Sequence, residues 1–411
     1  MIKKNEKDII IGLDTGFDAT KIVINGLELK IPYNVVDITG QESSMMLGSG
    51  TEYILTHYLN GKNYLVGEEA RKLLIESSYD ESMASHQATL NSFDKFETDY
   101  FEIGMLTAIG VALIRYSEAL KNEKEQHFDI NDYSAYVRKD EGRNKELDKF
   151  YKNVNIYVGI ALPNDIVDNA WEGVANKIAG VHSFDIELEG NNNFEISFSI
   201  EKDCCTSLSQ VRAAFLGLIT DDDGAPLTTA LVNPSKMPLL VLDGGYKTIG
   251  MFKLARNGSV VESESNTSFA MSNVNQKVAE AMKEDYNRAD IKEYKVEELA
   301  SEGSPIVYIP EGSDSTSTCS INKIRDEKIE ETCGELISYI DNKFHNFIDV
   351  KSVIVTGGTG KVYFEQIKKF IEEKRQPTEI YLTDYEFNGE KVSPTFAIAV
   401  GMYKYTKLQV G

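Results

Sequence analysis

The chain has 411 residues, of which 42% are hydrophobic, so it can bury the cores of two sizeable domains. With 65 acidic against 43 basic residues its formal net charge is −22, which opposes direct binding to nucleic acid and makes any self-association depend on salt or Mg²⁺. The four cysteines are too few and too scattered for a disulfide frame, and no stretch is apolar for long enough to span a bilayer, so we expect a cytoplasmic protein without membrane contact.

The first informative segment is a short apolar strand that runs into a polar turn. Residues 9–11 are β-branched and suit a buried strand, and a returning strand is expected over residues 21–24. Gly16 lets backbone N–H groups face an anion, and Lys21 can place an ammonium on the same anion. Asp14 would repel a phosphate. We therefore expect this carboxylate to bind the phosphate through a cation, most simply Mg²⁺, which it would hold through the water ligands of the metal.

The middle of the chain alternates helical and strand patterns. Apolar residues recur at helical spacing over residues 101–120, and the strongly charged stretch 121–152 is predicted to be an exposed helix end and loop. Apolar runs at 154–162 and 194–200 predict strands, the second after a glycine and asparagine turn that indicates a hairpin. A further helical face spans residues 211–218.

Two groups of charged residues are interpreted as solvated surface. The acidic run Asp221, Asp222 and Asp223 is expected to form a loop that ends a helix, because oxygen ligation of Ca²⁺ needs ligands spaced through a loop. The basic residues from Lys404 to Lys407 are expected on a solvated helix face.

A second strand and turn, around Asp243, repeats the pattern of the first. Its candidate phosphate-contacting residues are Gly244, Gly245, Tyr246, Lys247 and Thr248. A third apolar strand, at 353–355, runs into a turn with Gly357, Gly358 and Thr359. The glycines of that turn would let the backbone lie flat against a purine or ribose, although this segment taken by itself favours a tight strand-to-helix turn. No Walker A loop and no Rossmann fingerprint is present.

Two helices are predicted between the second and third turns. One spans about residues 272–286, and the other has an apolar stripe from 329 to 347. The polar stretch 313–320 between them is rich in Ser and Thr and is expected to be a flexible loop.

At these motifs the chain resembles the actin-like ATPases, within the superfamily of actin, Hsp70 chaperones and sugar kinases. Asp14 through Lys21 resembles the first phosphate motif, Asp243 through Thr248 the second, and residues 356–360 the adenosine motif. Residues 158–163 and 394–401 resemble the strand-to-proline turn and the second connecting helix. The segment 64–70 and the overall length are most similar to the bacterial plasmid-segregation actins of the ParM type.

The resemblance implies an α/β, actin-like fold with two domains, each with a mixed central sheet flanked by helices, and a nucleotide cleft between them. It places the first domain at residues 1–200, with an inserted subdomain at about 31–97. The second domain is placed at residues 201–394, with an insertion at about 262–345. A C-terminal helix at 395–411 returns to the first domain.

The resemblance also implies ATP or GTP with Mg²⁺ as the ligand. Asp14 and Asp243 would hold the metal, and the residues expected around the nucleotide are Asp14, Gly16, Phe17, Asp18, Lys21, Asp243, Gly244, Gly245, Tyr246, Lys247, Thr248, Gly357, Gly358 and Thr359. Gln210 is the candidate for positioning the attacking water, with Glu201 and Asp203 as acidic alternatives and a plain helix-surface role also open.

The function implied is a nucleotide-driven polar filament of the chain with itself, which moves plasmid DNA through a small DNA-binding adaptor. One alternative is a small-molecule kinase of the same superfamily, for which Asn164 and Asp165 would supply the base. The other is a scaffold that binds nucleotide without turnover.

Overall fold

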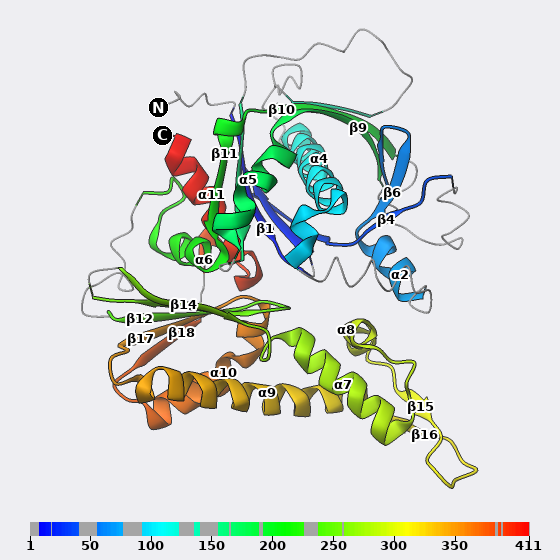
Figure 1. Cartoon of the computed structure of the whole chain (residues 1–411), viewed down its shortest axis with the longest axis vertical. Coiled ribbons are helices and arrows are strands. Elements are labelled where there is room, and N and C mark those ends of the chain that lie inside the picture. The colour runs from blue at the N-terminus through cyan, green and yellow to red at the C-terminus, as the bar shows by residue number, and fades with distance from the viewer. Residues whose placement is uncertain are drawn as a thin grey trace. The chain divides into compact units, whose positions relative to one another are not determined.

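The computed structural model describes residues 8–17, 19–40, 56–76, 93–122, 135–139, 155–163, 166–188, 192–225, 237–256, 259–382, 385–387 and 389–410. Its contacts divide the chain into two compact units. Figure 1 shows the whole chain, coloured from blue at the N-terminus to red at the C-terminus. The first unit is Met1–Leu227 with Tyr385–Gly411, and the second is Thr228–Asp384.

The first unit contains a mixed sheet of five strands in the order β11-β8-β1-β2-β3. These strands are β1 (Ile9–Thr15), β2 (Ala19–Ile24), β3 (Leu27–Pro32), β8 (Ile156–Leu162) and β11 (Cys205–Ser209). The first three form an antiparallel meander, which contains the strand and returning strand predicted from the sequence, and β8 and β11 run parallel to β1. Every residue of β1, β2 and β8 is buried, which explains their continuous apolar runs.

A second sheet of the first unit has the order β4-β6-β5-β9-β10-β7. Its strands are β4 (Val35–Asp37), β5 (Thr56–Leu59), β6 (Lys62–Val66), β7 (Ala135–Lys139), β9 (Gly180–Leu188) and β10 (Asn192–Ile200). Strands β9 and β10 pair as the predicted hairpin requires. The prediction of a helix end and loop was wrong for residues 135–139, because strand β7 pairs with β10.

The first unit also contains α-helices, short 3₁₀ helices and a two-stranded hairpin. They are α2 (Glu68–Glu76), η1 (Phe93–Glu97), α4 (Asp99–Asn122), α5 (Val167–Ile178), η4 (Lys202–Cys204), α6 (Gln210–Ile219), η7 (Pro394–Phe396) and α11 (Ala397–Val410), with the hairpin β19 (Tyr385–Phe387) and β20 (Glu390–Val392). Helix α4 contacts strands of both sheets, and this explains why its apolar residues surround the helix in place of a single stripe.

The second unit has one five-stranded mixed sheet in the order β14-β13-β12-β17-β18. Its strands are β12 (Leu239–Gly244), β13 (Ile249–Leu254), β14 (Val260–Asn266), β17 (Ser352–Thr356) and β18 (Glu379–Leu382). Its helices are α7 (Met271–Tyr286), α8 (Glu293–Glu302), α9 (Ile321–Lys343), η6 (His345–Phe347) and α10 (Gly358–Lys374). Figure 1 shows α9 and α10 along one face of this sheet, where apolar residues of both helices join the core.

The stretch between α8 and α9 differs from its prediction. Strands β15 (Ile306–Tyr308) and β16 (Ser317–Cys319) pair antiparallel, so part of the expected flexible loop at 313–320 is a strand of a hairpin. Of the Ser and Thr residues that suggested a loop, only Ser317 and Thr318 lie in β16, along which exposure alternates.

The two five-stranded sheets have the same topology. In each, a three-stranded antiparallel meander is followed by two strands parallel to its first strand. Asp14 on β1 lies opposite Lys21 and Ala161, and Asp243 on β12 lies opposite Gly250 and Thr356. The two aspartates therefore occupy equivalent positions in two equivalent sheets. The predicted α/β fold class, with a mixed central sheet and flanking helices in each half, is confirmed.

The division into units differs from the domain limits expected from the sequence. Residues 205–219 were assigned to the second half, but β11 pairs with β8 and α6 packs against α11, so both belong to the first unit. The chain returns to the first unit at Tyr385, ahead of the expected residue 395.

Lysines of α11 are partly buried, which corrects the prediction of a solvated basic face. Lys404 is 3% exposed, and its Nζ donates to the carbonyl oxygens of Gly217 and Thr220 at the end of α6. Its Nζ also lies 3.7 Å from a carboxylate oxygen of Asp222, and Lys407 pairs with Asp223 at 2.9 Å. The acidic loop therefore ends α6 and binds lysines of α11.

Helix α11 approaches α6 so closely that Gly401 cannot carry a side chain. A Cβ at Gly401 would lie 1.7 Å from the carbonyl oxygen of Ala213. We expect Gly401→Ala to lower the free energy of unfolding by about 2–3 kcal/mol, because the helices must separate. Urea unfolding followed by circular dichroism measures this.

The matched control for that variant is Gly173→Ala, at an exposed position of helix α5. A Cβ there meets nothing within 4 Å, so the substitution should stabilise the protein by up to about 1 kcal/mol through helix propensity. Equal effects of the two substitutions would contradict the close packing of α11.

His57 is a buried neutral histidine. Its Nδ1 lies 2.9 Å from the hydroxyl oxygen of Thr107, which itself donates to the carbonyl of Ile103, so Nδ1 is the protonated nitrogen. The other ring nitrogen has no hydrogen-bond partner among the described residues. Burial lowers the pKa of His57 to about 3.

The stability of the protein should therefore fall on acidification. Below pH 6.5 an unfolded histidine takes up a proton that folded His57 does not, so the free energy of unfolding should decrease by roughly 1 kcal/mol per pH unit. Urea titrations between pH 7.5 and pH 5 measure the slope. In His57→Phe, which keeps a ring stacked on Phe184, the slope should be shallower by that amount, and an unchanged slope would exclude His57 as its cause.

Candidate functional site

Asp14 lies at the carboxyl end of β1, almost fully buried. It is 3% exposed, and the antiparallel register places Lys21 of β2 directly opposite. The Lys21 Nζ is 3.6 Å from Asp14 Oδ2. The predicted cation and carboxylate of the first turn are thus an ion pair at one end of the sheet.

Gln210 reaches the same carboxylate. Its side-chain nitrogen donates to Asp14 Oδ1 at 3.0 Å. Strands β1, β8 and β11 are parallel, so their carboxyl ends meet at one edge, and Gln210 is the first residue of α6 after β11. The alternative of a plain helix-surface position does not describe this side chain.

The acidic alternatives to Gln210 lie elsewhere. Glu201 and Asp203 precede β11, whereas Gln210 follows it. Four strand steps of about 3.3 Å separate the two ends of β11, so the acidic residues lie at the opposite edge of the sheet from Asp14.

Lys95 is the residue of this site that the sequence analysis missed. It is 0% exposed, and its Nζ donates to the carbonyl oxygens of Thr15 at 3.0 Å and Gly16 at 2.9 Å. The ammonium also lies 4.3 Å from the ring centroid of Phe17 and 4.2 Å from that of Tyr33. A lysine between two phenylalanines in residues 93–96 was the only signal, and it has no strand or helix periodicity.

Asp243 is the penultimate residue of β12, as Asp14 is of β1. It is 5% exposed, and the turn that follows it is closed by a bond from the Gly245 N–H to the Thr248 carbonyl at 2.9 Å. The hydroxyl of Thr359, at the start of α10, donates to the Gly245 carbonyl at 2.7 Å. The second and third predicted turns are therefore in contact.

The glycines of these two turns are needed for that contact. A Cβ at Gly244 would lie 2.1 Å from the backbone nitrogen of Gly360. Gly357 has φ of +80°, and a Cβ there would lie 2.4 Å from the Gly244 carbonyl oxygen. Tight packing of β12 against the start of α10 accounts for both glycines.

Tyr246 and Lys247 turn their side chains toward α8. The Tyr246 hydroxyl donates to Glu293 at 3.4 Å, and the Lys247 Nζ lies 3.9 Å from the same carboxylate. A polar network continues from Tyr246 through three residues of α7, α8 and α9 that the sequence analysis did not single out, namely Asn275, Glu297 and Arg325. No periodicity marks such residues, because each is one polar position on an otherwise ordinary helix.

The structure thus brings the predicted residues together in two groups, one in each unit. Asp14, Lys21 and Gln210 are in contact in the first, with Gly16 and Phe17 in the same turn. The second contains Asp243, Gly244, Gly245, Tyr246, Lys247, Thr248, Gly357, Gly358 and Thr359. Three residues lie outside the described part of the chain: Asp18, and the kinase candidates Asn164 and Asp165.

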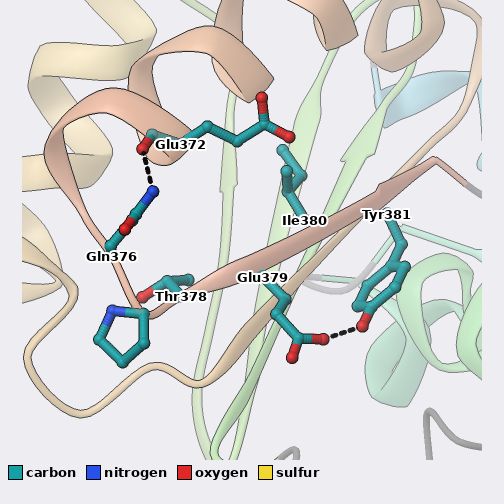
Figure 2. A pocket seen from close by; sticks show the side chains of 7 residues that line it. Glu372, Gln376, Thr378, Glu379, Ile380 and Tyr381 are labelled. Carbon is teal, nitrogen blue, oxygen red and sulfur yellow. Dashed lines mark hydrogen bonds between the residues drawn. The ribbon is translucent and has the colours of Figure 1, made fainter.

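A pocket at the edge of the second unit's sheet does not coincide with either group. Figure 2 shows its lining, which comes from the end of α10, from the turn after it and from β18. The side-chain nitrogen of Gln376 donates to the Glu372 carbonyl at 3.0 Å, and the Tyr381 hydroxyl donates to Glu379. With two carboxylates and no basic side chain in its lining, this pocket does not suit a phosphate.

Two further features are absent from the described residues. None of their helices is long and apolar enough to cross a membrane. No group of three or more His, Cys, Asp or Glu side chains among them can hold a metal ion.

Comparisons by sequence find no relative: no protein-family model matches the chain, and no curated protein does. Solved structures match it over nearly its whole length. For the actin-like protein Alp7A, identity is 15%, the TM-score is 0.64, and the match covers 98% of this chain and 97% of Alp7A. For Bacillus thuringiensis ParM with ATP, identity is 10%, the TM-score is 0.53, and coverage is 98% and 99%. For the Alp12 filament, identity is 16%, the TM-score is 0.52, and coverage is 98% and 100%.

These matches extend over both units, and each unit has its own mixed five-stranded sheet with an aspartate at the end of the first strand. The chain therefore has the actin-like fold of the ParM and Alp proteins.

Proposed function

We propose that this protein is a nucleoside triphosphatase whose nucleotide state controls assembly of the chain into a polar filament. The observation that carries the proposal is the repeated turn: Asp14 and Asp243 end equivalent strands of two sheets with one topology, and each is followed by a glycine-containing turn. Two such turns suit the two sides of one triphosphate. We propose that the two units are the two domains of this fold, with the limits that their contacts give in place of those at residues 200 and 394, and with insertions at about 31–97 and 262–345.

The ligand proposed is ATP or GTP with Mg²⁺. One structure of this fold, that of Bacillus thuringiensis ParM, contains ATP. Asp14 and Asp243 supply hard carboxylate oxygens, which fit Mg²⁺. Both oxygens of Asp14 already meet a donor, from Gln210 and Lys21, and this favours contact with the metal through its waters. The metal would neutralise charge on the transferred phosphoryl group.

Groups in both turns of the chain would bind the phosphates. Lys21 offers an ammonium at the first turn, and N–H groups of Phe17 and Asp18 face the same anion in this proposal. In the second turn, the phosphates are proposed to be bound by Gly244, Gly245, Tyr246 and Thr248, with Lys247 beside them. Gly357, Gly358 and Thr359 would border the nucleoside.

Gln210 is proposed to position the attacking water. Its side chain is held on Asp14, the carboxylate proposed to bind the hydrated metal. Phosphoryl transfer needs mainly a positioned water and charge stabilisation, so a neutral amide is sufficient for this role.

Loss of the γ-phosphate would remove contacts that join the two turns, and this would couple hydrolysis to the conformation of the protomer. A protomer that repeats head to tail assembles through a heterologous interface and forms an open polymer. Alp12, with the same fold, was solved as a filament. Since the chain's net charge of −22 opposes binding to DNA, a role in plasmid segregation would need a small DNA-binding adaptor.

Calorimetry with MgATP and MgGTP tests the nucleotide site. Asp14→Asn and Asp243→Asn should each weaken Mg²⁺-dependent binding by at least about tenfold, because each removes a carboxylate proposed to hold the metal. The control is Asp290→Asn, whose carboxylate pairs with Arg288 outside both turns. Gln210→Ala should keep its affinity while phosphate release falls by about a hundredfold.

Two outcomes would contradict this assignment. Binding of neither nucleotide by the wild-type protein would exclude the site. Tight binding without phosphate release, unchanged in Gln210→Ala, would establish the alternative of a scaffold without turnover.

Sedimentation and light scattering test the filament. With Mg²⁺ and ATP or GTP the protein should pellet, and the polymer should shorten as nucleotide is hydrolysed. Assembly should be stronger at higher ionic strength, because salt screens repulsion between acidic protomers. Gln210→Ala should give longer-lived polymer, and a monomer at every concentration and with every nucleotide would contradict the proposal.

A further inference from the structure

Lys95 contacts the first turn through the backbone carbonyls of that turn. Its Nζ donates to the carbonyls of two successive residues, Thr15 and Gly16, and it is fully buried. Rings of Phe17, Tyr33 and Phe96 lie with their centroids 4.2 to 5.1 Å from the ammonium. Aromatic faces attract a cation at this distance, so the ammonium is held from several sides.

This arrangement determines which way the amide groups of the turn point. Among the described residues, cis peptide bonds occur only before Pro238 and Pro377, so the bonds on either side of Gly16 are trans. In a planar trans peptide the carbonyl and the N–H point in opposite directions. With the Thr15 and Gly16 carbonyls on Lys95, the N–H groups of Gly16 and Phe17 point away from it.

The second turn has the same feature with a different donor. Gly245 stands two residues after Asp243, as Gly16 stands two residues after Asp14. Its carbonyl accepts a hydrogen bond from the Thr359 hydroxyl, so the Tyr246 N–H points away from Thr359. In both turns, a donor from a distant part of the same unit holds the carbonyl of the equivalent glycine.

We infer that Lys95 is a positioning residue of the first turn, which holds the Thr15 and Gly16 carbonyls so that the N–H groups of Gly16 and Phe17 are presented to nucleotide phosphates. The phosphate part of this inference rests on the proposed function. Lys95 binds the carbonyl oxygens of the turn and need not touch the nucleotide. Its role therefore differs from that of Lys21, whose ammonium is proposed to bind the phosphates. A preorganised set of N–H groups binds an anion without a rearrangement at the moment of binding.

The test compares Lys95→Met with Lys404→Met. Lys404 is a matched control, because it lies in the same unit, is 3% exposed, and also donates to two backbone carbonyls, those of Gly217 and Thr220. Both variants remove a buried ammonium, and both should lower the melting temperature. Experiments are run at a temperature at which circular dichroism shows both variants to be folded.

Two measurements follow on the full chain. Hydrogen exchange without nucleotide reports the turn itself: amides of residues 14–20 should exchange at least tenfold faster in Lys95→Met and unchanged in Lys404→Met. Calorimetry with MgATP and MgGTP should show at least tenfold weaker binding in Lys95→Met, against less than twofold in Lys404→Met. Lys95→Gln, which keeps one neutral donor, should fall between wild type and Lys95→Met and serves if the methionine variant does not fold.

The outcomes separate this inference from the proposed function. Faster exchange in the turn, with no nucleotide binding by wild type, would support the anchoring of the turn and exclude the nucleotide site. Nucleotide binding by wild type that is equally strong in folded Lys95→Met would overturn the positioning role and leave the nucleotide site intact. Equal losses of affinity in Lys95→Met and Lys404→Met would also overturn it, because a general loss of stability would then explain both.

Discussion

Parallel pairing of β8 with β1, and of β17 with β12, is the constraint on which both turns depend. Parallel strands bring their carboxyl ends to one edge of a sheet, and loops at that edge can then contact each other. In the first unit this pairing places Thr15 next to Ala161, whose carbonyl accepts a 2.9 Å bond from the Thr15 hydroxyl. In the second it places Asp243 beside Thr356, directly before the glycine turn that starts α10.

Close backbone approach is the second requirement of this architecture. Gly244 lies against Gly360, and Gly401 lies against Ala213, at distances where any side chain would overlap backbone atoms. Glycine is therefore needed for packing at both places. Packing alone accounts for these glycines, so the aspartates and their partners, and not the glycines, indicate a ligand site.

Buried ammonium groups stabilise two contacts within the first unit, that of η1 with the first turn and that of α11 with the end of α6. Removing a charge from water is costly unless hydrogen bonds compensate for it, and Lys95 and Lys404 each donate to two backbone carbonyls. Desolvation lowers the pKa of Lys404, although Asp222 acts in the opposite direction. In a chain with excess acidic residues, these lysines serve internal contacts and not a basic surface.

Local sequence determined the elements that depend on near neighbours: the hairpin of β1 and β2, the helices α4, α7 and α9, and the strand-end positions of Asp14 and Asp243. These follow from side-chain periodicity and turn residues, which act over a few positions. It did not reveal β7 or β16, because such short strands are formed by pairing with their partners and not by their own pattern. Only the tertiary structure brought Gln210 to Asp14 across 196 positions, and Lys95 to Thr15 across 80, since such contacts arise from strand order and helix packing that no local pattern encodes.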